Sequence, residues 1–229
     1  MINSTTDFQA GEIILIDKFK EWTSFDVVNK IRSRIKYQRN IPKIKVGHAG
    51  TLDPLATGLL VVCTGKKTKE LFKFQDATKE YIAKIKLGET TPSFDLETET
   101  DQKFPLDSLS EEQIIKVVTG FIGVQDQMPP AYSAKRVNGK RAYISARKGK
   151  SLDLKPASIE IFSIEIINID IPIVELKILC SKGTYIRAIA RDLGIALKNG
   201  ACLIELRRTK IGDLSVEDAI TVEQFQKML

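Results

Sequence analysis

The sequence predicts an α+β fold, and two features of its pattern carry that prediction. Strand-like and helix-like segments are mixed along the chain, without the regular strand–helix–strand alternation of a doubly wound sheet. Two strand-like segments, residues 158–170 and 171–180, follow one another with only a tight polar connection. The chain has 229 residues, 43% hydrophobic and 28% charged, an ordinary composition for a globular protein that buries a core.

The first part of the chain is predicted to hold two strands and two helices. Ser24 is a residue type favoured at a helix N-cap, and the helix that follows it carries an apolar face. That predicted face consists of Phe25, Val28, Ile31 and Ile35. The other elements are an apolar strand at 11–18, a buried strand at 59–63 and a short helix at 68–75.

The remainder of the chain is predicted to contain further strands and helices and one polar loop. Residues 80–87 alternate in hydrophobicity as a half-buried strand does, and residues 88–106 are polar and acidic, which indicates a surface loop. Ser110 and Gln113 form a capping box for a helix through Val118. The last elements are a helix at 184–198 that ends at Asn199-Gly200, a strand at 203–211 and a helix at 221–228.

The N-terminus and the apolar runs indicate a cytoplasmic protein. Residues 1–10 are polar, lack the basic and apolar regions of a signal peptide, and are predicted to form a mobile tail. The longest apolar runs, such as residues 58–63, are far too short to span a membrane. Cys63, Cys180 and Cys202 are odd in number and widely spaced, which indicates buried thiols rather than a disulfide framework.

The distribution of charge favours a polyanionic partner. The formal net charge is +6 and the pI is about 9.1. Residues 30–45 and residues 135–150 contain several lysines and arginines and no acidic residue, whereas acids concentrate in residues 95–107. Such basic stretches suit phosphate contacts, but on charge alone solvated surface faces explain them equally well. His48 is the single histidine, which excludes a zinc site built from several histidines.

The segment around Asp53 is the most informative part of the chain. Asp53 is the one acid among Gly47, Gly50 and Gly58, and Pro54 follows it directly. Proline biases the preceding residue toward an extended backbone, while glycine permits tight turns and the close approach of a ligand. The pattern predicts a carboxylate on a rigid loop before a buried strand. On composition alone, a structural turn capped by aspartate is the favoured interpretation.

Five segments form a set of motifs in a fixed order. They are Gly47-His-Ala-Gly-Thr-Leu-Asp-Pro-Leu-Ala-Thr-Gly-Leu-Leu60, Lys79-Glu-Tyr-Ile-Ala83, Pro129-Pro-Ala-Tyr-Ser-Ala-Lys135, Cys180-Ser-Lys-Gly-Thr-Tyr-Ile-Arg187 and Leu206-Arg-Arg208. In sequence and in order, this set resembles the TruB family of tRNA pseudouridine synthases. The resemblance implies the pseudouridine synthase fold, in which a mixed, mostly antiparallel central sheet is flanked by helices and loops.

The resemblance implies a catalytic role for Asp53, which matches the family's essential aspartate. Arg187 matches the arginine that pairs with this aspartate, and Tyr81 matches the tyrosine that stacks on the flipped target base. The reaction needs an ionised carboxylate but no redox cofactor or metal, so no cofactor is expected. An arginine beside the carboxylate would lower its pKa and orient it. Whether the aspartate attacks C6 of uracil, attacks C1′, or assists elimination to a glycal stays open.

Other positions match residues that surround the substrate in the family. They are the pocket residues Tyr185 and Leu206, the basic positions Lys18 and Lys182, and His48, whose counterpart engages the RNA loop. Residues two apart point to the same side of an extended segment but not of a continuous helix. Tyr185 and Arg187 are therefore expected to serve one site from an extended segment.

The resemblance covers nearly the whole chain and implies one catalytic domain over residues 11–229. Residues 125–152 resemble the family's mobile RNA-gripping insertion. Longer family members carry a C-terminal PUA domain that binds RNA, and this chain is expected to lack one. The insertion is then expected to carry more of the RNA grip. Its candidate RNA-binding residues are Lys135, Arg136, Arg141 and Arg147.

Two segments depart from the family's pattern. The family's Lys-Pro-x-Gly appears here as Lys18-Phe-Lys-Glu21, so that the proline and the glycine are both replaced. This change leaves the conformation of the loop open. Ala49 stands where threonine is common, which removes one hydroxyl.

The resemblance implies a stand-alone tRNA pseudouridine synthase that isomerises the T-loop uridine at position 55 after base flipping. The expected partner is tRNA, bound at its T-arm and elbow by a monomer that needs no membrane and no other protein. The alternative function is a tRNA-binding folding factor that opens and reanneals the elbow independently of catalysis. A guide-RNA-dependent relative is a third, weaker possibility.

Overall fold

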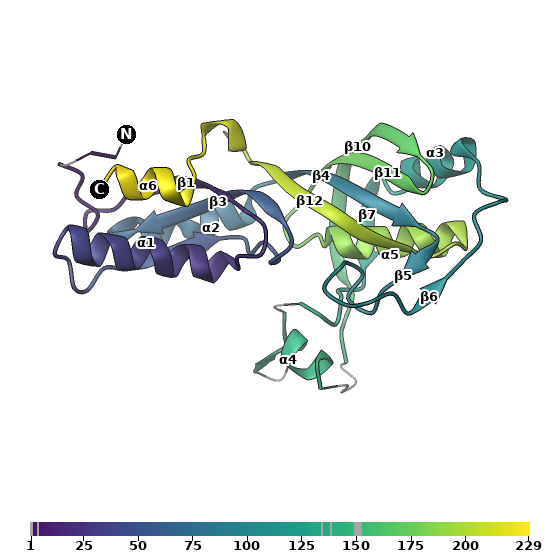
Figure 1. Ribbon diagram of the computed structural model, residues 1–229, viewed down its shortest axis with the longest axis horizontal. Coiled ribbons are helices and arrows are strands. Elements are labelled where there is room, and N and C mark those ends of the chain that lie inside the picture. The colour runs from purple at the N-terminus through teal and green to yellow at the C-terminus, as the bar shows by residue number, and fades with distance from the viewer. Residues whose placement is uncertain (1, 4, 134, 138, 149–152) are drawn as a thin grey trace. The chain divides into compact units, whose positions relative to one another are not determined.

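The computed structural model consists of two compact units. It describes residues 2–3, 5–133, 135–137, 139–148 and 153–229. Unit 1 comprises residues 1–81 and 206–229, and unit 2 comprises residues 82–205. The chain passes from one unit to the other inside two strands, β4 (Lys79–Leu87) and β12 (Ala201–Ile211) (Figure 1).

The sheet of unit 1 is organised around β3 (Thr57–Thr64), whose residues are almost all buried. On one side, β1 (Ile13–Lys18) pairs with it in antiparallel register along its full length. On the other side of β3, β2 (Val46–Ala49) is antiparallel to the C-terminal half of β3. β12 is parallel to the first two residues of β3, which are adjacent to the β2–β3 loop. β13 (Leu214–Ser215) extends β12 as a short hairpin. The loop between β2 and β3 therefore lies beside β12.

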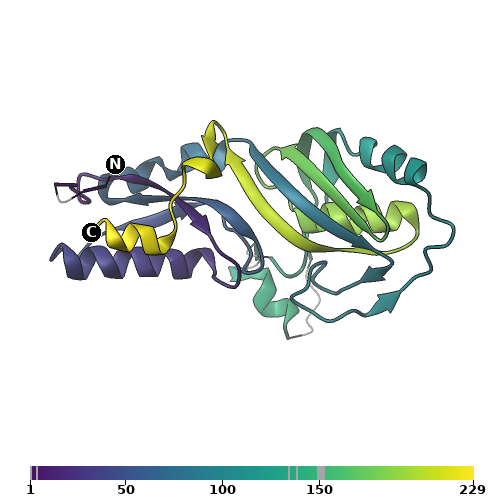
Figure 2. The ribbon, with the colours of Figure 1, turned by 45° about the horizontal axis from the view of Figure 1, so that its top comes forward.

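Helices cover the sheet of unit 1 and close its core. α1 (Ser24–Gln38) and α6 (Val222–Lys227) lie side by side against the face formed by Ile14, Ile16, Leu60 and Val62 (Figure 2). The 3-10 helix Gly65–Glu70 and α2 (Leu71–Asp76) follow β3 and contact β2.

Two details of this packing differ from the sequence-based prediction. The N-cap of α1 is Thr23, which forms a capping box with Asp26, and Phe25 is 58% exposed while Val27 takes its expected place in the core. Phe8 is fully buried and packs edge-on against Phe225. Residues around Phe8 are thus part of the packed unit, where a mobile tail was expected for residues 1–10; residues 1 and 4 lie outside the described residues.

The sheet of unit 2 has the strand order β12–β4–β11–β10–β7. β10 (Ala157–Asp170) is antiparallel both to β11 (Ile173–Cys180) and to β7 (Gly123–Gln127). The apolar face of α5 (Ile186–Leu197) packs on one side of this sheet, and α3 (Glu111–Thr119) lies next to α5. The α+β class and the mixed, mostly antiparallel sheet are thereby confirmed, since the β3–β12 pair is parallel.

Between β7 and β10 the chain leaves the sheet. It forms a short antiparallel pair, β8 (Arg136–Val137) and β9 (Lys140–Arg141), and then α4 (Ala142–Ala146), which Figure 1 shows set apart from the sheet of unit 2. This excursion occupies the position of the expected RNA-gripping insertion. Residues 134, 138 and 149–152 of that insertion lie outside the described residues.

The polar segment after β4 is more ordered than a surface loop. β5 (Glu89–Thr90) pairs with β6 (Gln102–Lys103), and Thr91, Ser93 and Asp95 between them are buried. The prediction of a surface loop over residues 88–106 was therefore wrong for its central part. In the part of the chain that the structure describes, no helix is long and apolar enough to cross a membrane.

Candidate active site

Asp53 lies at the turn between two strands of unit 1. β2 and β3 pair from Val46–Thr64 to Ala49–Val61, and residues 50–56, the Asp53 loop, connect them. The backbone carbonyl of Asp53 accepts a hydrogen bond from the amide of Ala56 at 3.1 Å, which closes a tight turn through Pro54. The side chain of Asp53 is half-buried. The turn thus holds a carboxylate at the end of a buried strand, as the sequence predicts.

Lys18 supports the Asp53 loop from the end of β1. Its buried ammonium donates hydrogen bonds to the carbonyl oxygens of Phe19, Trp22 and Pro54 at 3.0, 2.7 and 3.3 Å. These three bonds use the three protons of the ammonium, so Lys18 holds the loop in place. Burial lowers the pKa of Lys18 to about 8, although the nearby Asp53 carboxylate favours the charged form and opposes the shift.

Ser24 supports the same loop through its hydroxyl. The hydroxyl accepts a hydrogen bond from the amide of Leu52 at 2.8 Å and donates one to the carbonyl of Leu52 at 3.1 Å. Both residues are buried. Ser24 was expected to be a helix cap; instead it fixes the residue that precedes Asp53, while the neighbouring threonine caps the helix.

Arg208 supports the loop from β12. Its fully buried guanidinium donates to the carbonyl oxygens of Leu59 at 2.8 Å and Gly50 at 3.0 Å. Gly58 makes this approach possible, because a Cβ atom there would lie 2.3 Å from the carbonyl oxygen of Arg208, and because its φ of +100° suits only glycine. Arg208 belongs to the motif Leu206-Arg-Arg208, but no role was predicted for it.

The segment that departs from the family pattern keeps a defined conformation. Glu21, at the glycine position, has a φ of 74°, in the left-handed region that glycine prefers. Its amide donates to the carbonyl of Pro54 at 2.8 Å, next to Asp53. Phe19 and Trp22 flank it, with their rings 4.7 Å apart. The sequence left the conformation of this loop open. The structure defines it: Glu21 adopts a strained left-handed backbone conformation, and its amide is bonded to the Asp53 loop.

Three further candidate residues of unit 1 lie on strands. His48 is in β2, and its buried Nδ1 has no hydrogen-bond partner among the described residues. Burial, and then the charge of Arg208, lower the pKa of His48, so its imidazole is neutral at pH 7. Tyr81 is buried in β4, and Leu206 is half-buried in β12, where its carbonyl accepts a hydrogen bond from Thr57.

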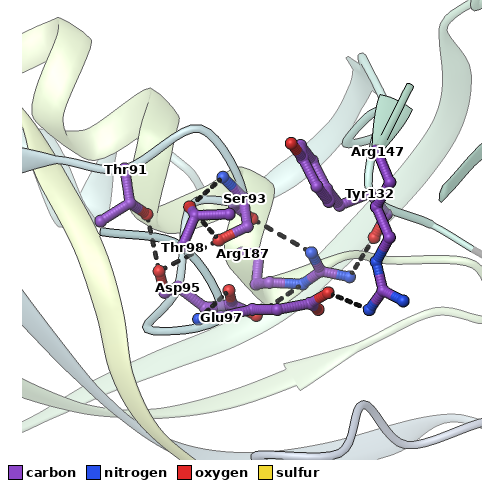
Figure 3. Close-up of polar contacts among 8 residues, drawn as sticks. All are labelled: Thr91, Ser93, Asp95, Glu97, Thr98, Tyr132, Arg147 and Arg187. Atoms are coloured by element: carbon purple, nitrogen blue, oxygen red, sulfur yellow. Dashed lines mark hydrogen bonds and ion pairs between the residues drawn. The ribbon is translucent and has the colours of Figure 1, made fainter. Parts of the chain in front are cut away.

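Arg187 is the centre of a polar cluster in unit 2 (Figure 3). It lies in the first turn of α5, and its guanidinium donates to the carbonyl oxygens of Ser93 at 3.0 Å and Tyr132 at 2.8 Å. Its Nε lies 3.5 Å from a carboxylate oxygen of Asp95, with the two side chains 3% and 7% exposed. The pairing of Arg187 with Asp53 that the resemblance implies joins the two units and stays a prediction.

The cluster gives residues 91–98, the polar loop, a defined structure. The hydroxyls of Thr91 and Ser93 both donate to the carbonyl of Asp95, at 2.6 and 3.1 Å. The Asp95 carboxylate accepts the amide of Glu97 at 3.0 Å. The hydroxyls of Ser93 and Thr98 share a 2.8 Å hydrogen bond. Asp95 is a functional candidate that the sequence analysis missed, because a polar loop gives no periodic signal.

Tyr185 immediately precedes α5 in an extended conformation. It is the N-cap residue, with φ −99° and ψ 111°, so the helix begins two residues later than predicted. The side-chain amide of the buried Gln127 accepts a hydrogen bond from the backbone N–H of Tyr185 at 2.8 Å and donates one to the backbone carbonyl of Tyr185 at 3.1 Å. Arg187 lies inside the helix, so the expectation that one extended segment carries both Tyr185 and Arg187 was wrong. Lys182, three residues earlier, is exposed.

The candidate RNA-binding residues of the excursion also belong to unit 2. Arg136 and Arg141 are register partners in the backbone pairing of β8 with β9. Lys135 donates to the carbonyl of Lys155 at 3.0 Å, and Arg147 forms an ion pair with Glu97 of the polar loop at 2.5 Å. The first contact therefore joins two parts of the excursion, and the second joins the excursion to the polar loop.

The fold is similar to that of chains in solved multi-component complexes. A chain from a Cbf5–Nop10–Gar1 complex superposes with a TM-score of 0.70 at 28% identity, over 96% of this chain and 54% of that chain. A chain from an H/ACA RNP bound to a substrate RNA containing 2′-deoxyuridine gives a TM-score of 0.69 at 27% identity, over 96% and 53%. The present chain spans about half the length of these chains.

Curated relatives are similar over nearly their full length. "tRNA pseudouridine synthase B" of Parabacteroides distasonis is 50% identical over 223 residues, which is 97% of this chain and 95% of the relative. The protein of the same name from Flavobacterium johnsoniae is 46% identical over 224 residues, or 97% and 98%.

Two family models match consecutive parts of the chain. Residues 34–186 match the model of the N-terminal domain of TruB family pseudouridylate synthases, and residues 187–229 match the tRNA pseudouridylate synthase B C-terminal domain. The fold, the motifs and these matches define a pseudouridylate synthase, an isomerase. Within that class, the chain belongs to the TruB family.

Proposed function

We propose that this enzyme converts the uridine at position 55 of the tRNA T-loop into pseudouridine, with Asp53 as the catalytic carboxylate. The observation that supports this most strongly is the support of the Asp53 loop from three directions, by Lys18, Ser24 and Arg208. A carboxylate presented on a fixed loop needs little reorganisation to reach a transition state. Relatives named tRNA pseudouridine synthase B support tRNA as the substrate.

The reaction rearranges one nucleotide. The bond between N1 of uracil and C1′ of ribose breaks, the freed base turns, and its C5 joins C1′; the hydrogen of C5 is lost and N1 gains one, so the atoms balance. The target must leave the stack before Asp53 can reach it. The freed base must also be retained, for which an aromatic ring and an apolar wall are suited. We assign these roles to Tyr81 and Leu206, with Tyr185 as a further pocket residue.

Arg187 orients the Asp53 carboxylate at the reacting centre. Other residues hold the RNA, and among them the neutral His48 engages the RNA loop as a hydrogen-bonding group without charge. Phosphate contacts come from Lys182 and from the basic residues of the excursion: Lys135, Arg136, Arg141 and Arg147. The enzyme acts as a cytoplasmic monomer on the T-arm and elbow of tRNA.

An Asp53→Asn variant tests the proposal, because the amide keeps the size of the side chain but cannot be ionised. Unmodified tRNA is incubated with the wild type and with the variant, and pseudouridine is mapped along the RNA. The wild type is expected to modify the T-loop uridine, and the variant to form no product while binding the RNA as tightly. No product at that uridine with the wild type would contradict the substrate assignment. If the Asp53→Asn variant still formed pseudouridine, the assignment of Asp53 as the catalytic carboxylate would be wrong.

A further inference from the structure

Arg147 contacts a carboxylate of the polar loop. Its guanidinium follows α4 at the end of the excursion, and its Nη2 lies 2.5 Å from Oε1 of Glu97 in the polar loop (Figure 3). The aromatic ring of Tyr143 lies 5.6 Å from the guanidinium carbon. This candidate RNA-binding arginine therefore contacts both an aromatic ring and an acid.

The polar loop contacts the excursion at two places of unequal strength. Near the start of the excursion, Arg187 joins the carbonyl oxygens of Ser93 and Tyr132 with one buried guanidinium. Near its end, the ion pair joins Arg147 and Glu97, whose side chains are 60% and 28% exposed. Buried charged contacts are costly to break, whereas exposed ion pairs contribute little and are screened by salt. The Glu97–Arg147 contact is the one that a ligand can replace.

The chemistry of Arg147 selects the kind of ligand. A guanidinium presents planar, paired N–H donors that fit a carboxylate or a phosphate equally well. In the sequence, Lys148 follows directly and Lys140 and Arg141 precede it, so this basic stretch favours an anion with more than one negative group. A nucleic-acid backbone supplies such a series of phosphates, while Glu97 supplies a single carboxylate.

We propose that Glu97 takes the place of an RNA phosphate in the free enzyme. It holds Arg147, and with it the end of α4, against the polar loop, and it releases Arg147 to the phosphodiester backbone when RNA binds. Glu97 thus restrains the excursion and competes with the substrate. This inference rests on the proposed function only in taking RNA as the ligand.

The test is a double-mutant cycle with a matched control. Glu97→Gln removes the charge and keeps the shape, Arg147→Gln removes the partner, and Glu99→Gln removes an exposed acid two residues further along the same segment. Binding of a fluorescent T-arm hairpin RNA is measured by anisotropy for each variant and for the Glu97→Gln/Arg147→Gln double variant. Hydrogen exchange of residues 142–148 is measured without RNA.

Glu97→Gln is expected to bind the hairpin about two- to fivefold more tightly, which is the range that an exposed ion pair can supply. Glu99→Gln should change binding less, because its charge acts only through screened solvent. In the Arg147→Gln background, Glu97→Gln should have no further effect beyond that of Glu99→Gln. Without RNA, exchange of residues 142–148 should be faster in Glu97→Gln than in the wild type and the control.

Two results would overturn the inference while leaving the proposed function intact. One is weaker RNA binding by Glu97→Gln, since the acid would then position Arg147 for RNA instead of competing with it. The other is an equal gain in Glu97→Gln and Glu99→Gln that persists without Arg147, which would reduce the effect to net charge. The function fails separately, if the wild type binds the hairpin but forms no pseudouridine in tRNA.

Discussion

The Asp53 loop of unit 1 and the polar loop of unit 2 support their functional side chains in opposite ways. In unit 1, buried side chains bind the backbone of the loop, and the loop presents the carboxylate of Asp53. In unit 2, backbone carbonyl oxygens bind the functional side chain itself, the guanidinium of Arg187. The first arrangement holds the backbone of a turn in place, and the second holds a charged side chain in place.

This difference determines how each loop responds to mutation. Removal of a supporting cation in unit 1 leaves buried carbonyl oxygens without donors and frees the backbone around Asp53. Removal of the acid in unit 2 leaves most hydrogen bonds of Arg187 in place, because they come from the main chain. Unit 1 should therefore be the more sensitive of the two, and three predictions test this expectation.

The largest effect is expected for Arg208→Met. Two hydrogen bonds from a fully buried charged group are lost, and the carbonyl oxygens of Gly50 and Leu59 each lose a charged donor. The free energy of unfolding should fall by about 4 kcal/mol, from the cost of two such bonds. The corresponding fall in Tm is roughly 8–16 °C for a chain of this size. Differential scanning calorimetry measures it, with pseudouridine formation assayed well below the Tm.

The neighbouring arginine provides the control for this experiment. Arg207 pairs with Asp17 through two hydrogen bonds of 2.9 and 2.8 Å, but the two side chains are 40% and 31% exposed. Arg207→Met should cost less than about 1 kcal/mol, as exposed ion pairs do. If both variants lowered the free energy of unfolding equally, the bonds from Arg208 to backbone carbonyl oxygens would stabilise the protein no more than an exposed ion pair does.

The same contrast explains what could be predicted from the sequence. Asp53 was found because its loop carries a local signature: glycines that permit the turn, and a proline directly after the acid. Of the two strands that flank this loop, β3 was predicted from its apolar run to within two residues, whereas β2 was not predicted. These features depend on neighbours in the chain, which a sequence displays directly.

The support of Arg187 could not be predicted in the same way. Its partners Ser93, Asp95 and Tyr132 are distant in sequence, and none belongs to a periodic pattern. Thr91 and Ser93 are buried because their hydroxyls satisfy the Asp95 carbonyl, a reason that composition cannot reveal. Ser24 was misassigned for a related reason, since Thr23 and Ser24 are both good caps and a tertiary contact to Leu52 decides between them.

A smaller effect is expected for Asp95→Asn in unit 2. The amide keeps its volume and can still accept the Glu97 amide, but the buried guanidinium of Arg187 loses its nearby negative charge. A loss of about 2 kcal/mol in the free energy of unfolding is expected, below the range for buried pairs in direct contact because the separation is 3.5 Å. Urea denaturation measures it, with Asp17→Asn as the matched exposed control. A loss larger than that of Arg208→Met would reverse the ranking of the two loops.

The smallest effect is a gain, expected for Glu21→Gly. Glu21 has a φ of 74°, and a left-handed conformation costs a non-glycine residue roughly 1 kcal/mol. Glycine removes that strain but adds freedom to the unfolded chain, so the net gain should be below about 1 kcal/mol.

Lys198→Gly provides the equivalent test in unit 2, since Lys198 caps α5 at a φ of 59°. Lys20→Gly, with no positive φ, should lose stability instead. If urea denaturation showed a gain at Lys198 but a loss at Glu21, contacts of the glutamate would outweigh its backbone strain, and the Asp53 loop would depend on this departure from the family's glycine.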